Sequence, residues 1–444
     1  MATSRSVPDF SFVHAADLHL DTPFKGIGAT APFVGEQLRE ASLEAFDALV
    51  ETCFEHEAAF LVVAGDIYDG PERGLRAQLR FRDGLARLSD SGISSFIVHG
   101  NHDPVETGWS ALGGAWPDRV TVFGSDEVGA VTVERDGAPL ATVQGISYGQ
   151  RREQRNLALR FRAAAGPGLQ VGVLHCNVQG AASGYDDYSP CSLADLRSAG
   201  IDYWALGHIH SRLVLSGATG SAEPWVVYSG NLQARSPKPS ERGPKGATVV
   251  RVAAGRVVAA DPVACDRIRF DAVEVDAGDI YDLGELRGEL ASAALDRLGG
   301  AQGRSIVVRG RVVGRSGLAG DLRRPGVLAD LLTTLREDFS QAAPFCWWDA
   351  LEDASASRID LEVVRAGSDF ASDLVAMADR LRDQLVAEEG SVEALASELA
   401  DGLPGAARRA DLLGHLTGDG SDRDDDLVGR ALSLALGELE RDGA

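Results

Sequence analysis

Five apolar segments in the first half of the chain each end in Asp, Asn or His, and this pattern constrains the fold most strongly. The polar groups that follow these segments are DLH at 17–19, DIYD at 66–69, NHD at 101–103, His175 alone, and HIH at 208–210. Short apolar segments of this kind predict buried strands. Because open α/β sheets bind ligands at the carboxyl ends of their strands, we expect these side chains to meet at one sheet edge.

The first 265 residues alternate predicted strands with predicted helices, which is typical of an α/β layered domain. The strands are predicted at 12–16, 60–65, 95–100, 120–123, 140–146, 170–175, 202–207 and 225–229. The helices are predicted at about 35–56, 73–90 and 189–199. Turn residues at Asp136-Gly137 and at Gly255 predict hairpins, so antiparallel pairs should join the sheet.

The length of 444 residues predicts more than one domain. We expect a catalytic domain at 1–265, a small α/β domain at 266–365 and a helical, acidic region at 366–444. The small domain should contain strands at 269–276, 304–313 and 359–364 and helices at about 282–298 and 326–339. The fold class is therefore α/β, followed by a smaller α/β unit and helices.

Composition excludes several classes of protein. No apolar run approaches the roughly 20 residues that span a bilayer, and the first ten residues lack the apolar centre of a signal peptide. The five cysteines are odd in number and never form CxxC, which favours a reducing cytoplasm over a disulfide framework. We therefore expect a cytoplasmic protein without a membrane partner.

The charge is strongly negative but uneven. The formal net charge is −23, and the acidic run SDRDDDL at 421–427 lies in the C-terminal part. Only three of the 43 basic residues are lysines, so any basic patch must consist mainly of arginine. Net charge sets the long-range field without excluding a local basic groove or bound cations, so it counts only modestly against DNA binding.

The polar groups at the strand ends are typical ligands of divalent metals such as Mn²⁺, Fe²⁺ or Zn²⁺. Seven candidates are too many for one tetrahedral ion and favour two ions, roughly 3.5–4 Å apart, that share a carboxylate. Any single cluster also has an ordinary structural explanation, such as a helix cap, a turn or a buried histidine. We expect such structural roles for His14, His99, Asp21 and Asp69, and exclude them from the metal ligands.

The ordered series DLHL, GDIYD, GNHD, a lone His after a strand, and GHIH resembles the calcineurin-like metallophosphoesterases. The longer segments HAADLHLDTPFKG, HGNHDP, ALGHIHSR and YSGNLQARSPKPSERGPKG resemble the SbcD-type DNA repair exonucleases, and among them the YhaO group. The resemblance covers about residues 10–250. It implies a two-sheet sandwich flanked by helices, and two divalent metal ions, with Mn²⁺ expected first and Mg²⁺, Fe²⁺ or Zn²⁺ as alternatives.

The resemblance also assigns roles to individual residues. One ion would be held by Asp17, His19 and His210, the other by Asn101, His175 and His208, with Asp66 bridging. A metal-bound hydroxide would attack phosphorus, and His102, oriented by Asp103, would protonate the leaving oxygen. The expected activity is DNA exonuclease action in repair, together with an SMC-like, YhaN-like ATPase that binds the C-terminal helices. Family members commonly form homodimers.

Residues outside the metal motifs suggest the DNA surface. Arginines are concentrated between 304 and 324, within the domain that guides DNA in SbcD-type proteins, and we predict DNA contacts for Arg304, Arg309 and Arg311. Lys238 and Lys245 lie in the Pro-rich loop beside the expected site and are further candidates. That loop follows YSGN, where the family usually has YPGN, so substrate preference could differ.

Two other functions compete with the exonuclease. One is a phosphodiesterase of small or cyclic nucleotides, which would leave the C-terminal half without a role. The other is a DNA-end-binding protein with weak catalysis, for which missing metal ligands would be expected. A phosphoprotein phosphatase is disfavoured because no Arg follows directly after Asp69.

Overall fold

The computed structural model describes residues 8–387 and Leu432, with gaps at 23, 25–26, 29–30, 71–73, 107–115, 165–167, 183–185, 340–342 and 359–360. The chain divides into two compact units. The first consists of the described residues within 1–271, 297–308 and 341–349, and the second of those within 272–296, 309–340 and 350–444. The domain boundaries at 265 and 365 stay predictions. Most of the region predicted at 366–444 lies outside the described residues.

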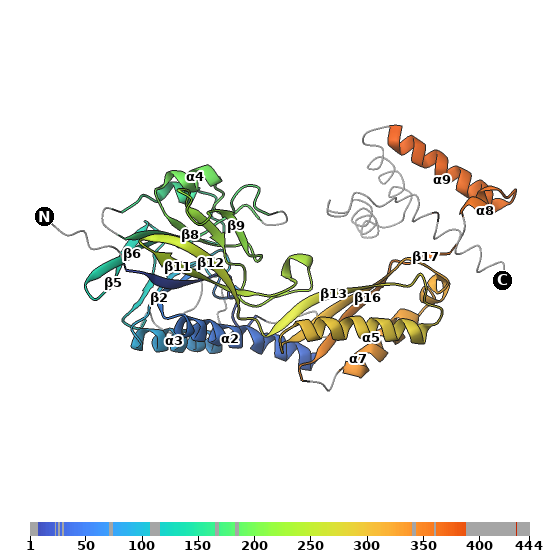
Figure 1. The fold of residues 1–444 in the computed structure, drawn as a ribbon, viewed down its shortest axis with the longest axis horizontal. Helices are drawn as coiled ribbons and strands as arrows, with labels where there is room; N and C mark the ends of the chain where they lie inside the picture. The colour runs from blue at the N-terminus through green and yellow to red at the C-terminus, as the bar shows by residue number, and fades with distance from the viewer. Residues whose placement is uncertain are drawn as a thin grey trace. The chain divides into compact units, whose positions relative to one another are not determined.

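Two six-stranded sheets form the centre of the first unit (Figure 1), and each has four parallel strands flanked by antiparallel ones. The first sheet has the order β12 (Arg256–Ala264), β11 (Gly246–Ala253), β1 (Phe10–Ala15), β2 (Ala58–Ala64), β3 (Ser94–Val98) and β4 (Val120–Val122). The second has the order β5 (Gly129–Arg135), β6 (Ala138–Gly145), β7 (Leu169–His175), β8 (Tyr203–Gly207), β10 (Trp225–Tyr228) and β9 (Leu213–Ser216). The hairpins predicted at Asp136-Gly137 and Gly255 are confirmed by the pairs β5–β6 and β11–β12.

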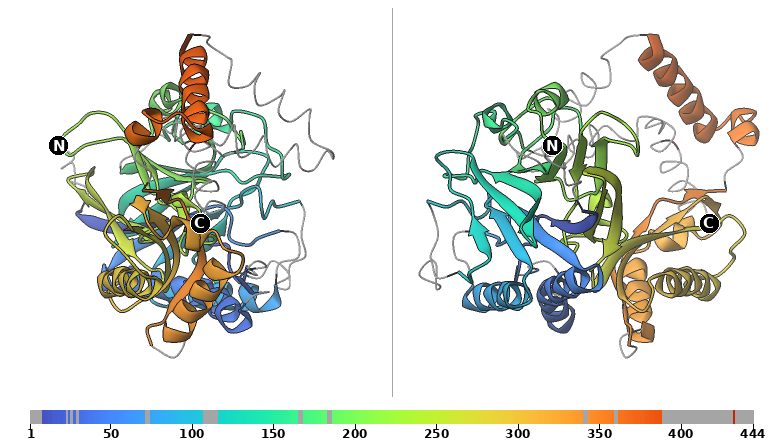
Figure 2. Two further views of the ribbon diagram at one scale, coloured as in Figure 1. Left: turned by 90° about the vertical axis from the view of Figure 1, so that its right-hand side faces the viewer. Right: turned by 60° about the vertical axis from the view of Figure 1, so that its left-hand side comes forward.

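Alternate residues of the central strands face different layers, as the period of two in a strand requires. Phe12 and Phe60 stack in the core between the two sheets, with ring centroids 4.7 Å apart. Val13 and Leu61 face the opposite way and pack against helices α2 (Pro32–Glu55) and α3 (Leu75–Asp90). Figure 2 shows these two helices side by side on the outer side of the first sheet.

A third apolar cluster covers the outer side of the second sheet. It includes Trp204 of β8, Leu157 of the short helix η1 (Leu157–Arg160) and Leu196 of α4 (Leu193–Ser198). The resulting order of layers is helix, sheet, sheet, helix. This confirms the predicted α/β fold class with a two-sheet sandwich between helices.

A three-stranded sheet follows, with the order β13 (Ile268–Asp276), β14 (Ser305–Val313) and β16 (Cys346–Asp353). The remaining elements, in chain order, are α5 (Leu283–Gly300), β15 (Arg315–Ser316), α6 (Ala319–Leu322), α7 (Val327–Phe339), β17 (Ala356–Ser357), α8 (Leu361–Arg365) and α9 (Phe370–Ala387). The two helices predicted at 282–298 and 326–339 are confirmed as α5 and α7.

The strand predicted at 359–364 is wrong, because residues 361–365 form helix α8. The third strand of the small sheet is β16, in which Cys346 and Trp348 are buried. Val363 in α8 is 68% exposed, so the apolar alternation in this segment does not face a core. The aromatic CWWD sequence supplied the buried face instead.

The two sheets approach each other closely at the strand ends that carry the polar clusters. Gly207 ends β8, and a Cβ atom there would lie 1.9 Å from the carbonyl oxygen of Ala64 in β2. Gly100 has the same constraint, because its Cβ would lie 2.3 Å from Asp66 Oδ1. Only glycine permits this approach without a backbone shift.

We therefore expect Gly207→Ala to lower the free energy of unfolding by about 1–3 kcal/mol, the usual cost of overpacking. The added methyl group meets backbone, which cannot rotate away. Gly124→Ala is the matched control, because a Cβ at Gly124 meets no atom within 4 Å. Chemical denaturation of both variants measures the difference, and equal midpoints would contradict the prediction.

Two further properties bear on cellular context. None of the described helices combines the length and apolar character needed to cross a membrane. All five cysteines are buried and free.

Candidate metal centre

The polar clusters after β1, β2, β3, β7 and β8 converge at one edge of the two sheets. Asp17, His19 and His210 offer ligand atoms that all lie within 4.8 Å of one another, and Asp17, Asp66 and His175 do the same. Asp17 belongs to both groups, so the two sets of donors adjoin.

The other two predicted ligands lie against these groups. Asn101 Oδ1 is 2.9 Å from His175 Nε2, and the backbone N–H of His208 donates to both carboxylate oxygens of Asp17, at 3.1 and 3.0 Å. The imidazoles of His175 and His208 have ring centroids 5.3 Å apart. The structure therefore brings all seven predicted ligands into one cluster.

The orientation of three histidines leaves one ring nitrogen of each for a ligand. His175 Nδ1 lies 2.9 Å from the Ala64 carbonyl, and His208 Nε2 lies 2.9 Å from the Asp186 carbonyl. Because a carbonyl oxygen only accepts, these nitrogens carry the proton. His210 Nδ1 lies 2.6 Å from Glu241 Oε1. This arrangement, with one nitrogen fixed by an oxygen, is the usual one for metal-binding imidazoles.

The electrostatics of the cluster fit bound cations. Burial, together with the adjacent Asp66 carboxylate, raises the pKa of Asp17 well above its usual value. Burial and the neighbouring cationic groups lower the pKa of His19, and its Nδ1 is buried without a hydrogen-bond partner among the described residues. Two adjacent buried carboxylates surrounded by neutral imidazoles are a donor set for divalent cations.

His102 stands beside the cluster, and its partner differs from the prediction. His102 Nδ1 lies 2.6 Å from Asp69 Oδ1. Asp103, predicted to orient His102, instead accepts hydrogen bonds from the backbone of Ile67 and Gly100 and lies 3.0 Å from His99 Nδ1. Its carboxylate thus ties the strand ends together, and the orienting role predicted for Asp103 is corrected to Asp69.

The contacts of Asp69 shift the pKa of His102. Burial favours the neutral imidazole, but the hydrogen bond to Asp69 and the charges of Asp66 and Asp69 outweigh it, so the pKa of His102 is raised. A histidine whose protonated form is favoured is suited to donate a proton near neutral pH.

His14 and His99 have the structural roles expected of them. His14 is fully buried, bonds to the Tyr203 hydroxyl and the Leu206 carbonyl, and has its pKa lowered to about 3 chiefly by burial. Asp21 forms an ion pair with Arg39.

Three residues of the site were not predicted as functional: Asp69, Arg235 and Glu241. Burial would raise the pKa of Glu241, but its hydrogen bond with His210 and the charges of His210 and Lys245 lower it to about 2. Arg235 Nη2 donates to Asp69 Oδ2 at 2.5 Å. Asp69 lay within a recognised motif, whereas the other two lie in a Pro-rich loop whose path the sequence did not indicate.

Two residues predicted to contact DNA are engaged within the protein. Lys245 is buried, and its ammonium donates to the carbonyls of His210 and Ser240. Arg304 pairs with Asp266 at 2.7 Å and donates to two backbone carbonyls. Neither side chain is presented to a phosphate, and both predictions are corrected. Lys238 and Arg309 are exposed, and Arg311 lies 3.6 Å from Glu274.

Several predicted ligands have unusual backbone conformations. Asp17, His19 and Asp66 have positive φ angles of 50°, 43° and 52°, and His208 has a φ of 104°. Left-handed conformations are uncommon for residues other than glycine. They turn the chain sharply at the strand ends, so that each side chain points into the cluster.

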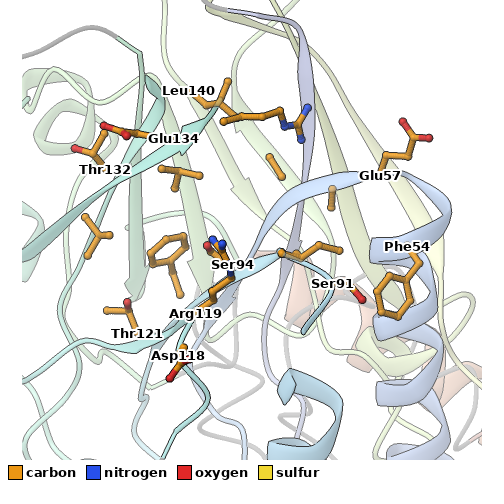
Figure 3. A pocket seen from close by; sticks show the side chains of 18 residues that line it. Phe54, Glu57, Ser91, Ser94, Asp118, Arg119, Thr121, Thr132, Glu134 and Leu140 are labelled. Atoms are coloured by element: carbon orange, nitrogen blue, oxygen red, sulfur yellow. The ribbon is translucent and has the colours of Figure 1, made fainter. Parts of the chain in front are cut away.

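A separate cavity of about 720 Å³ lies at the opposite strand ends and holds none of the predicted site residues. Its wall includes Glu57 and Ser91 on one side and Thr132 and Glu134 on the other (Figure 3). These residues adjoin the beginnings of β2, β3 and β6, whereas the cluster follows strand ends. The candidate metal centre is thus a separate feature of the fold.

Two family models match the chain. The model of the calcineurin-like phosphoesterases matches residues 10–212, and that of the middle domain of the metallophosphoesterase YhaO matches 270–356. The chain belongs to the calcineurin-like phosphoesterases.

Its particular type follows from the second match and from individual relatives. The chain is 36% identical over 249 residues to the uncharacterized metallophosphoesterase YhaO of Bacillus subtilis, which is 56% of this chain and 59% of YhaO. It is 27% identical over 228 residues to the DNA double-strand break repair protein Mre11 of Aeropyrum pernix (48% and 53%). It is also 27% identical over 143 residues to SbcD, a component of the nuclease SbcCD of Escherichia coli K12 (32% and 33%).

These matches identify the chain as a metallophosphoesterase of the SbcD/YhaO type. It covers less than two thirds of the length of each of these relatives.

Proposed function

We propose that this protein is a metal-dependent phosphodiesterase that acts on DNA ends as an exonuclease. The observation that carries the proposal is the convergence of Asp17, Asp66, His175 and His210, from four separate strand ends, into one buried cluster. The relatives Mre11 and SbcD are a DNA repair protein and a component of a nuclease, which supports DNA as the substrate.

The seven clustered side chains fit a pair of divalent ions, with the assignment expected from the resemblance. When bound, the ions would activate water and neutralise charge on the phosphate. Asp17, His19 and His210 would hold one ion, Asn101, His175 and His208 the other, and Asp66 both. Oxygen and nitrogen donors without sulfur favour Mn²⁺ or a similar metal.

His102 would serve as the proton donor to the leaving sugar oxygen. Its Nδ1 is engaged by Asp69, so the proton to be transferred is on Nε2. Asp69 holds the imidazole in this orientation and favours its protonated form.

The proposed function is tested by incubating the full-length protein with labelled DNA duplexes in Mn²⁺, Mg²⁺ or chelator. We expect metal-dependent shortening from DNA ends and no hydrolysis in chelator. Cyclic nucleotides are offered in parallel. Preferential hydrolysis of cyclic nucleotides would establish the small-nucleotide phosphodiesterase instead, and tight end binding without cleavage would establish a DNA-end-binding protein.

Arg309 and Arg311 on β14, with exposed Lys238, remain our candidates for DNA contacts. If each arginine meets one phosphate, the double variant Arg309→Gln/Arg311→Gln should bind duplex DNA more weakly. The slope of log affinity against log salt should fall by about two. Fluorescence anisotropy at several salt concentrations measures both quantities. The control is Arg119→Gln/Arg135→Gln, which removes two exposed arginines at the separate cavity. Equal slopes for the two double variants would remove β14 from the DNA surface.

The partner that we propose is an SMC-like ATPase, because SbcD is one component of the SbcCD nuclease. Helix α9 exposes Phe370 and Met377, at 67% and 49%, while Val375 is buried against α8. An apolar surface of this kind is suited to a partner helix. A homodimer and a cytoplasmic location also remain part of the proposal.

A further inference from the structure

The loop between β10 and β11 brings a guanidinium group to the candidate metal centre. Arg235 lies in this loop and donates from Nη2 to Asp69 Oδ2, at 2.5 Å. The other oxygen of Asp69 lies 2.6 Å from His102 Nδ1. His102, Asp69 and Arg235 therefore form a continuous hydrogen-bonded row beside the cluster.

This row is the part of the site that solvent reaches. The side chains of His102, Asp69 and Arg235 are 29%, 25% and 21% exposed. The predicted ligand His210 is 15% exposed, and the other six are below 8%. A substrate phosphate that approaches the cluster must therefore pass this row.

The guanidinium has donors to spare. It carries five N–H groups, and Asp69 accepts from Nη2 alone, because His102 occupies the other carboxylate oxygen. The Nε atom is buried and has no hydrogen-bond partner among the described residues. An arginine with a purely structural role commonly forms a two-point contact with its carboxylate. Here the fork of the guanidinium remains available to an anion.

The loop is anchored to the cluster, which fixes the position of Arg235. Glu241, in the short helix η2 (Pro239–Glu241), accepts hydrogen bonds from Asn231 Nδ2 at 2.7 Å and from the backbone N–H of Arg235 at 3.3 Å. The same carboxylate engages His210. Lys245 donates to the His210 carbonyl from the end of the loop. One predicted metal ligand and the arginine thus share a single support.

We propose that Arg235 binds the substrate phosphate directly, by donating hydrogen bonds to a non-bridging oxygen. The inference rests on the proposed phosphodiesterase function and adds a substrate-contacting residue that the metal motifs do not contain. Charge-assisted contacts of a guanidinium with phosphate are strong and directional. Glu241 is a positioning residue in this scheme, because it acts through the loop and through His210.

The test measures binding of inorganic phosphate to the full-length, Mn²⁺-loaded protein by calorimetry. We expect Arg235→Gln to weaken phosphate binding about 10- to 100-fold, the effect of losing a hydrogen bond to a charged group. Arg235→Lys keeps the charge but lacks the fork, so it should restore only part of the affinity. Arg242→Gln is the matched control, because Arg242 is an exposed arginine of the same loop. All variants should bind Mn²⁺ as the parent protein does.

Hydrolysis of bis(p-nitrophenyl) phosphate provides a second measurement. A phosphate contact should raise KM in Arg235→Gln, whereas a role confined to holding Asp69 would lower kcat and leave phosphate affinity unchanged. The inference is overturned by that second pattern, or if the parent protein with Mn²⁺ binds no phosphate. If the parent binds phosphate through Arg235 but hydrolyses no phosphodiester, the proposed function fails while the phosphate site stands.

Discussion

Asp66→Asn is expected to abolish high-affinity Mn²⁺ binding and to reduce hydrolysis by more than about 1,000-fold. Asp66 Oδ2 lies 3.5 Å from His175 and 3.8 Å from His19, between the two groups of donors. Removing its charge takes a shared ligand from both proposed ions. Calorimetric titration with Mn²⁺ and a nuclease assay measure the two losses.

The substitution is chosen to preserve the fold. An asparagine keeps the oxygen that accepts a hydrogen bond from the His102 backbone, at 2.9 Å. Asp118→Asn, an exposed carboxylate at the separate cavity, controls for the change in net charge. Parental Mn²⁺ affinity in Asp66→Asn would disprove the assignment of this residue as a ligand.

His102→Ala is expected to bind Mn²⁺ as the parent protein does but to hydrolyse DNA about 100- to 10,000-fold more slowly, the range for loss of a general acid. The sugar oxygen is a poor leaving group and needs a proton. A nitrophenolate leaves without one, so the loss should be much smaller with bis(p-nitrophenyl) phosphate. Rates on the two substrates measure the contrast.

The matched control is His56→Ala, which removes an exposed histidine that directly follows α2. It should leave both rates unchanged. An equal loss on DNA and on the nitrophenyl ester in His102→Ala would show that His102 does not act as the acid.

The sequence was most informative where local pattern and tertiary structure coincide. A parallel strand delivers its final residues to one edge of the sheet, so DLH and HIH could be placed together although nearly 200 residues separate them. The same reasoning brought together all seven predicted ligands. It required no knowledge of loop paths, because strand ends alone set the positions.

Prediction failed where position depends on a loop or on competition for a partner. Arg235 and Glu241 reach the cluster through a turn at η2 and hydrogen bonds across the loop, none of which has a periodic pattern. Asp103 and Asp69 are both near His102 in the motifs, and only the backbone geometry decides which carboxylate meets the imidazole. Lys245 was expected at the surface, yet carbonyl oxygens pair with its ammonium inside the protein.

The positive φ angles at Asp17, His19 and Asp66 affect how inactive forms of this enzyme should be designed. Holding such conformations costs roughly 1–3 kcal/mol each, and asparagine tolerates them better than alanine does. Alanine scanning at these positions would therefore combine lost chemistry with a backbone penalty. Asparagine replacements separate the two effects and are the better choice for trapping a substrate complex.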